Sequence, residues 1–87
     1  MRIRIEETID YFNGLHPEGK LTQRQLARIV MPDTNIIPAQ LYLKKLNSGE
    51  LGSKKSINAD VIERIIKYTG VTLDFLFDFE HTGQEEI

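Results

Sequence analysis

The 87-residue chain contains no cysteine. Its core must therefore form without disulfides, a Cys-based zinc site is excluded, and a reducing compartment is the expected environment. Long apolar runs are missing too, since nothing approaches the roughly 18 consecutive apolar residues that a membrane-spanning helix needs. The N-terminal segment MRIRIEETID also lacks the apolar core that marks a signal peptide. These absences predict a cytoplasmic protein with no membrane partner.

Residues arranged for catalysis are also missing. No nucleophile, base and orienting acid occur together, and no Gly-rich phosphate-binding loop is present. His16 and His81 are single histidines without a second ligand at metal-binding spacing. We therefore expect no enzyme activity, no metal site and no cofactor.

A surplus of positive charge is absent from the whole chain but present in its middle. The formal net charge of −2 disfavours a nucleic-acid partner, because phosphate neutralisation requires Lys and Arg. However, residues 20–57 carry seven bases and two acids, a net +5, whereas residues 1–19 carry −2 and residues 58–87 carry −5. This polarity suits a protein that presents one face to a polyanion, and chance clustering of solvated lysines is the alternative.

Apolar spacing and capping residues predict a series of short helices. Ile5, Ile9 and Phe12 recur at helical spacing and indicate a first helix over about residues 3–13, which NGLHPEG ends. Thr22 and Gln25 have the spacing of a capping box, so that a second helix begins at Gln23. Its apolar stripe consists of Leu26, Ile29 and Val30.

The third helix is expected after an unusual connection, MPDTNII. Pro32 ends the second helix near Val30 or Met31. Two starts of the third helix remain open: Asn35 caps it with Pro38 in the first turn, or Pro38 is its first residue. Its inner face consists of Ala39, Leu43 and Leu46. Gly49 suits a left-handed C-terminal cap, and the following ELGSKKS is expected to form a flexible basic loop.

Two further helices complete the predicted domain. Asn58 caps the fourth, with Ile57 and Ile62 at the spacing of a hydrophobic staple. Its buried stripe is expected to comprise Ile62, Ile65, Ile66 and Thr69. Gly70 closes this helix, and Thr72 caps a short fifth helix, LDFLFDF. With no strand-like alternation, we expect one all-α domain over residues 1–79 and a polar, frayed tail over residues 80–87.

Three motifs then appear in a characteristic order: LTQRQLARIV, LYLKKLNSG and INADVIERIIKYTGVTLDFLF. Over about residues 20–77 they resemble the lambda-repressor-like, Cro/C1-type helix-turn-helix family. Members have a Ser or Thr cap, Gln, Leu-Ala, an Asn-Gly-like turn and a final Gly-Val-Ser/Thr-Leu-Asp. The matching residues here are Thr22, Gln23, Leu26, Ala27, Asn47 to Gly49, and Gly70 to Asp74. The resemblance implies a five-helix fold and a bacterial or phage transcriptional regulator that binds double-stranded DNA.

The resemblance also implies roles for single residues. Gln23 would touch a phosphate and brace Gln40, which would contact adenine from a recognition helix over about residues 38–47. Leu41 would meet a thymine methyl, and Lys45 would reach a guanine edge or a phosphate. The implied DNA contacts are Gln23, Arg24, Gln40, Leu41, Lys44, Lys45, Asn47, Ser48, Lys54 and Lys55. The alternatives are ordinary exposed glutamines, solvated lysines and a Leu41 and Tyr42 that serve in packing.

The chain departs from the family between the second and third helices. The distance from Val30 to Gly49 is about six residues longer than the family's usual spacing, and the glycine of the tight turn is absent. This enlargement bears on the angle between the two helices and on how closely base contacts follow the family pattern.

The C-terminal half suggests two kinds of protein partner. Repressors of the family pair through their C-terminal helices, which implies a homodimer that reads two half-sites one helical turn apart. The interface residues expected are Tyr68, Phe75, Phe77 and Phe79. The alternative function is a protein-binding module, such as an antitoxin that neutralises a toxin partner with this acidic, aromatic half. A third reading is a relic of the fold without DNA affinity.

Overall fold

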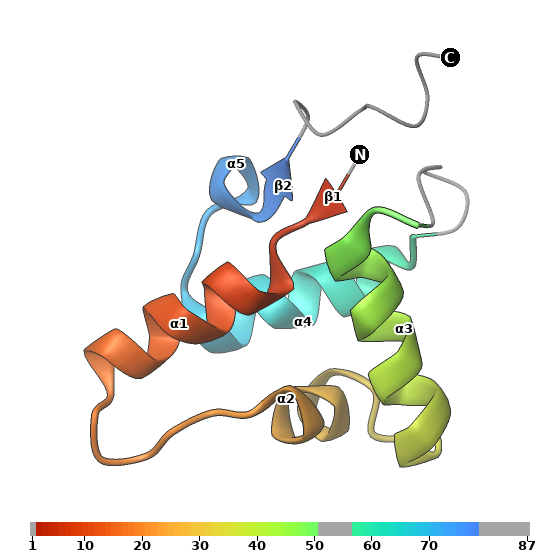
Figure 1. Ribbon diagram of the computed structural model, residues 1–87, viewed down its shortest axis with the longest axis horizontal. Helices are drawn as coiled ribbons and strands as arrows, with labels where there is room; N and C mark the ends of the chain where they lie inside the picture. Colours follow the sequence, from red (N-terminus) through yellow and green to blue (C-terminus); the bar gives the residue numbers. More distant parts are fainter. Residues whose placement is uncertain (1, 51–56, 79–87) are drawn as a thin grey trace.

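The computed structural model describes residues 2–50 and 57–78, which form five helices and one small antiparallel sheet (Figure 1). The helices are α1 (Ile5–Leu15), α2 (Gln23–Val30), α3 (Ile36–Ser48), α4 (Ala59–Thr69) and α5 (Leu73–Leu76). The strands are β1 (Arg2–Ile3) and β2 (Phe77–Asp78). The mostly helical architecture agrees with the sequence prediction. The basic loop, with Lys54 and Lys55, and the polar tail lie outside the described residues.

The third helix occupies a central place in this arrangement. α3 packs against α1, α2 and β1, while α1 and α2 both contact α4. In Figure 1, α3 runs steeply through the right side of the view, whereas α1 and α4 run across it. Strands β1 and β2 lie together at the top, so that the two ends of the described chain meet. None of the described helices has the length and apolar character required to cross a membrane.

A single apolar core joins the helices. Its most completely buried large side chains include Leu26, Leu43, Leu46 and Ile65, each at most 1% exposed. Burying a leucine or isoleucine side chain contributes about 1.5–3 kcal/mol relative to leaving it exposed. Because Leu43 and Leu46 belong to α3, the inner face of this helix holds it firmly in the domain.

Local capping confirms where several helices begin. The Thr22 hydroxyl accepts from the Gln25 backbone N–H at 3.1 Å, and the Gln25 side chain accepts from the Thr22 N–H at 3.0 Å. The Asn58 side chain caps α4 and the Thr72 hydroxyl caps α5 in the same manner. Each bond satisfies an N–H group that the first helical turn leaves without a partner.

Two helices end as expected at glycine. Gly49 follows α3 with φ of 80°, and Gly70 follows α4 with φ of 83°. Both lie in the left-handed region, where a Cβ atom is unfavourable. The start of α3 is also decided: Asn35 is its cap and Pro38 lies in its first turn.

The first and last predicted helices had wrong boundaries, and the sheet is the reason for two of them. β1 and β2 pair in antiparallel register, Arg2 with Asp78 and Ile3 with Phe77. Pairing keeps the chain extended until Arg4, so that α1 begins at Ile5, two residues later than predicted. It also ends α5 at Leu76, although the prediction continued this helix through Phe79. Independently of the sheet, α1 continues through Gly14 to Leu15, two residues beyond its predicted end.

The buried stripe of α4 differs slightly from the prediction. Val61 joins Ile62, Ile65 and Thr69 in the buried set. Ile66, which was predicted to be buried, is only partly covered and faces the side of α5. The stripe is therefore rotated by part of a turn toward α2, which α4 contacts.

Candidate nucleic-acid interface

The outer face of α3 is the most distinctive exposed helix surface among the described residues. Ala39, Leu43 and Leu46 point into the core. The opposite side carries Ile37, Leu41, Lys44 and Ser48, which follow one another at intervals of four, three and four positions. All four are exposed, Ile37 at 77% and Leu41 at 49%. We call these four residues the outer stripe of α3.

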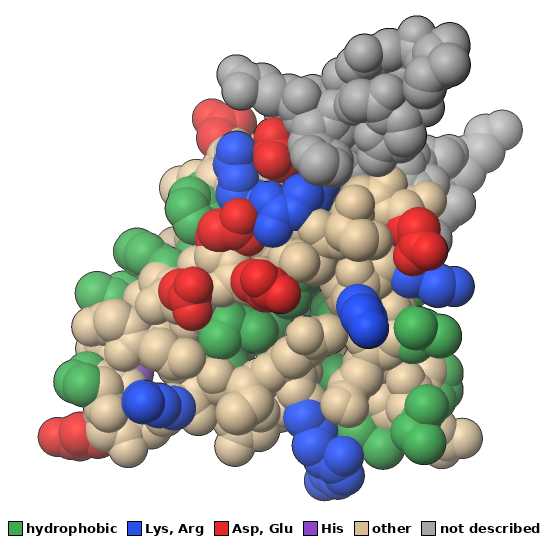
Figure 2. Space-filling view, viewed as in Figure 1, with side chains coloured by type: hydrophobic (Ala, Val, Ile, Leu, Met, Phe, Trp, Pro, Cys, Tyr) green, Lys and Arg blue, Asp and Glu red, His purple; other side chains and the backbone are tan. Residues whose placement is uncertain are grey.

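Basic side chains lie on this stripe, next to it on α3, and on the neighbouring helix α2. Lys44 is exposed, Lys45 is partly exposed beside it, and Arg24 and Arg28 are exposed on α2. Figure 2 shows Lys and Arg side chains in the lower and right parts of the view, over α2 and α3. It shows acidic side chains over α1 and also beside Lys and Arg side chains at the top of the view. Basic side chains therefore lie over α2 and α3 but are not confined to these helices.

The C-terminal half of α3 borders a hollow of about 690 Å³. Its lining residues are Leu41, Lys44, Lys45, Ser48, Gly49 and Glu50. Two lysines and one glutamate give this hollow a positive balance. It has the lining to take an anionic group beside an apolar one.

The structure brings Gln23 and Gln40 together through the backbone of Gln40, whereas the family resemblance implies a contact with its side chain. The side-chain Nε2 of Gln23 donates to the backbone carbonyl of Gln40 at 3.2 Å. This bond uses the carbonyl of Gln40 and not its side-chain amide. Gln40 is half-buried on the flank of α3 that faces α2. The contact of Gln40 with adenine stays a prediction.

The enlarged connection between α2 and α3 is closed by local bonds and by α4. Thr34 N–H donates to the Met31 carbonyl at 3.2 Å, which makes a turn in place of the absent glycine. The guanidinium of Arg64, on α4, donates to the carbonyl of Val30 at 2.9 Å. This donor satisfies a carbonyl at the C-terminal end of α2, where helices leave acceptors without partners. α2 and α3 remain packed together despite the longer connection.

Asn47 has a structural partner set that the sequence did not reveal. Its side-chain oxygen accepts from the Glu6 backbone N–H at 3.0 Å and from Arg2 Nη2 at 3.1 Å. Its backbone carbonyl accepts from Arg2 Nε. Asn47 therefore joins the C-terminal end of α3 to β1 and to the first turn of α1.

Ser48, also predicted to contact DNA, bonds within its own helix end. Its hydroxyl donates to the Lys45 carbonyl at 3.1 Å and accepts from the Glu50 N–H at 3.2 Å. The serine therefore helps to terminate α3.

Arg2 is the centre of a small ionic cluster. Its Nη2 lies 2.7 Å from Glu7 Oε1, and its Nη1 lies 3.6 Å from Asp78 Oδ2. Arg4 Nη2 also lies 3.5 Å from Asp78 Oδ1. The hydrogen bond from Arg2 lowers the pKa of Glu7, and the same bond raises the pKa of Arg2. The cluster fixes the guanidinium that holds Asn47.

Tyr42 and Leu41 have different environments in the structure. The Tyr42 hydroxyl accepts from the Asn58 N–H at 2.7 Å, at the start of α4. Tyr42 is thus a structural residue, as the packing alternative had it. Leu41, on the next position, points outward and is half exposed.

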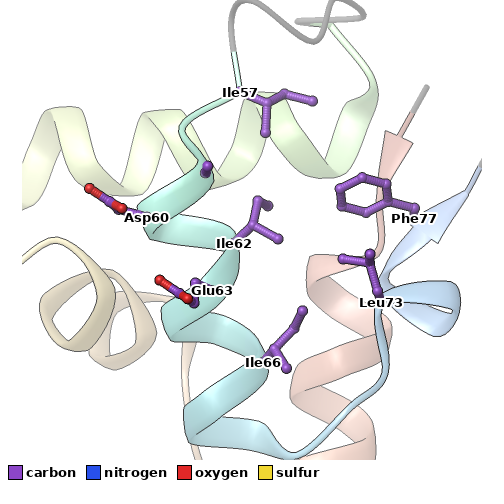
Figure 3. A pocket seen from close by; sticks show the side chains of 8 residues that line it. Ile57, Asp60, Ile62, Glu63, Ile66, Leu73 and Phe77 are labelled. Atoms are coloured by element: carbon purple, nitrogen blue, oxygen red, sulfur yellow. The ribbon is translucent and has the colours of Figure 1, made fainter.

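The aromatic residues predicted for the dimer interface are distributed over different surfaces. Tyr68 stacks on Phe12 with ring centroids 5.3 Å apart, and Phe75 lies 6.0 Å from Tyr11. Phe77 lines a separate groove (Figure 3). The three described aromatics therefore do not form one patch, and Phe79 lies outside the described residues.

The groove beside Phe77 is strongly apolar and has a volume of about 470 Å³. In Figure 3, Ile57, Ile62 and Ile66 face Leu73 and Phe77 across it, while Asp60 and Glu63 point away. Leu73 is 53% exposed. We call this surface the α4–α5 groove. It shares no residue with the outer stripe of α3.

No family model, curated protein or solved structure matches the chain.

Proposed function

We propose that the protein is a sequence-specific DNA-binding transcriptional regulator of the repressor type, with α3 as the helix that enters the major groove. The observation that carries the proposal is the outer stripe of α3, an exposed helix face that carries Lys44, with Lys45 beside it and exposed arginines on the neighbouring α2. An α-helix with its side chains is about 10–12 Å across, which matches a major groove about 12 Å wide.

The proposed contacts divide by chemistry. Gln40, held by Gln23 near the N-terminal half of α3, offers an amide to base edges. Arg24, Lys44 and Lys45 would neutralise phosphates and set the register on the duplex. Lys54 and Lys55 are proposed as further phosphate contacts. We give Asn47 and Ser48 structural roles, because their side-chain oxygens are engaged within the protein.

The acidic remainder of the chain supports this orientation. Residues 58–78, the described part of the C-terminal half, carry four acids and two bases, a net −2, and this charge disfavours contact of DNA with α4 and α5. A polyanion would therefore approach the face formed by α2 and α3.

The first experiment measures binding to a random-sequence duplex and to the DNA upstream of the protein's own gene, at several salt concentrations. We expect tighter binding to the upstream DNA and a steep loss of affinity with salt, because bound phosphates release counterions. Replacing Lys44 and Lys45 by glutamine should reduce the salt slope by about one for each lysine. Lys67→Gln, an exposed lysine on α4, is the matched control and should leave the slope unchanged. Absence of binding at micromolar protein and low salt would refute the proposal.

We also propose that two copies pair through the α4–α5 groove. A single small domain makes few DNA contacts, so useful specificity requires two half-sites. The groove suits this purpose because it is apolar, carries the half-exposed Leu73 and leaves the outer stripe uncovered. Light scattering over a range of concentrations should show a dimer, and Leu73→Asp should convert it to a monomer. A monomer at all concentrations would contradict this interface.

The same groove favours a second candidate function, a protein-binding module such as an antitoxin. An exposed apolar surface in an acidic half of the chain suits a basic partner with apolar side chains. Co-purification with a small protein encoded next to it, lost in Leu73→Asp, would support this function. DNA binding by the unaltered protein that also co-purifies with this partner would show that both functions coexist.

A further inference from the structure

Two apolar side chains stand at the end of α3 that is proposed to read bases. Ile37 is 77% exposed, more than any other large apolar residue in the described part of the chain, and Leu41 is 49% exposed. They are four positions apart and therefore neighbours on the same helix face. Figure 2 shows hydrophobic side chains at the right of the view, where α3 lies, between basic ones. We call Ile37 and Leu41 the apolar pair.

The apolar pair does not belong to the core of the domain. The core is reached from the opposite face of α3, through Ala39, Leu43 and Leu46. Single exposed apolar residues are ordinary on protein surfaces, but two adjacent ones on an outward helix face indicate a contact surface.

The basic residues near the apolar pair indicate which kind of partner it can contact. Lys44 follows the pair by one turn on the outer stripe, and Arg24 is exposed on the neighbouring α2. A partner must therefore be anionic around an apolar centre. The major groove of DNA has this chemistry, since phosphates flank it and the C5-methyl group of thymine is its apolar feature.

Resting on the DNA-binding function proposed above, we propose that Ile37 recognises the methyl group of a second thymine in each half-site, beside the thymine contact that the family resemblance implies for Leu41. Side chains at positions i and i+4 have Cβ atoms about 5–6 Å apart, and successive base pairs are about 3.4 Å apart. The two thymines should therefore lie within two base-pair steps of each other. The start of α3 at Ile36 matters here, because a helix beginning at Pro38 would leave Ile37 outside it.

The test compares thymine with uracil, which differs only in lacking the methyl group. A duplex that the full chain selects from a random library is resynthesised with uracil at each thymine position in turn. Burial of one methyl-sized group contributes about a fourfold change in affinity, so two such substitutions together should weaken binding by about fifteenfold. All other thymines should be replaceable with little effect.

Protein variants show whether the apolar pair is responsible. With Ile37→Ala and Leu41→Ala combined, the thymine and uracil duplexes should be bound equally, because the partners of the methyl groups are gone. Leu15→Ala removes a leucine that is 58% exposed on α1 and should preserve the difference. Thermal unfolding of each variant verifies that the domain is folded, which the exposure of all three residues leads us to expect.

The outcomes separate the inference from the function on which it rests. Equal binding of thymine and uracil duplexes by the unaltered protein would overturn the methyl recognition and leave DNA binding intact. A preference for thymine that survives in the double variant would assign it to other residues and overturn the role of the pair. Failure to bind any duplex would refute the proposed function itself.

Discussion

The two ends of α3 are held in very different ways. At the N-terminal end, the side chain of Asn35 makes no capping bond, and Gln23 makes one bond, to the Gln40 carbonyl at 3.2 Å. At the C-terminal end, Gly49 closes the helix and Asn47 is bonded to Arg2 and to the Glu6 N–H. The C-terminal end of α3 thus has more side-chain hydrogen bonds to the rest of the domain than the N-terminal end has.

This difference agrees with the roles that we propose, namely base contacts at the N-terminal end of α3 and attachment to the domain at its C-terminal end. Polar groups that bond within the protein are not available to a ligand, and the end proposed to read bases has few such bonds. The bonds at the C-terminal end fix the position of α3 relative to β1 and α1. The N-terminal end has fewer such bonds. Its side chains can therefore change rotamer when they contact bases, as interface side chains commonly do.

The largest effect is expected at the inner face, which both ends share. Leu43→Ala should lower the free energy of unfolding by about 2–5 kcal/mol, because it opens a cavity in a fully buried site. Leu41→Ala, two positions away on the outer stripe, should change it by less than about 0.5 kcal/mol. Denaturant unfolding of both variants makes the comparison. A similar loss in both would mean that Leu41 is a packing residue.

The contrast between the two ends is tested most directly by Asn47→Ala and Gln23→Ala. Removing the Asn47 side chain leaves the Glu6 N–H and part of the Arg2 guanidinium without an acceptor, which should cost about 2 kcal/mol. Gln23→Ala removes a single bond to a carbonyl and should cost about 0.5–1 kcal/mol. Equal losses in denaturant unfolding would mean that the two ends are anchored alike.

Features that depend on near neighbours were predictable from the sequence. The caps at Thr22 and Asn58 and the left-handed Gly49 each involve residues within about four positions, so that local patterns specify them. The sheet was not predicted, because its strands contain two residues each and pair across almost the whole described chain. The alternation of Arg2, Ile3 and Arg4 is the signal for β1 in the sequence, and it is too short to distinguish a strand from the predicted helix start at about residue 3.

The candidate site divides in the same way. The outward direction of Leu41 and Lys44 follows from the inward direction of Leu43 and Leu46, and periodicity suffices to predict it. The role of Asn47 depends on Arg2, which is 45 positions away in the sequence. No local pattern specifies such a pair. The sequence therefore offers only the family resemblance, which implies a DNA contact for Asn47.

The lack of a side-chain capping bond at the N-terminal end of α3 also predicts that the N-cap residues of α3 and α2 contribute differently to stability. Asn35 makes no side-chain capping bond, and the third helical residue, Pro38, has no N–H to offer it. Asn35→Ala should therefore cost less than about 0.5 kcal/mol, whereas Thr22→Ala should cost about 1 kcal/mol by removing a capping-box bond. Thermal unfolding resolves this difference, and an equal loss would imply that Asn35 stabilises α3 as an ordinary cap.

The smallest effect concerns pH and acts on the C-terminal end of α3. The bond from Arg2 lowers the pKa of Glu7 below its usual value of 4.5. A carboxylate with a lowered pKa stabilises the folded state above its unfolded pKa, and this contribution is lost as the pH falls through the folded value. The difference in melting temperature between the unaltered protein and Glu7→Gln should therefore be larger at about pH 7 than at about pH 3. Because the Glu7 side chain is 43% exposed, solvent screening keeps the difference small. Asp10→Asn, which removes an exposed carboxylate from the same helix, is the matched control. A Glu7→Gln difference that is the same at both pH values would mean that the ion pair contributes nothing to holding Arg2 against Asn47.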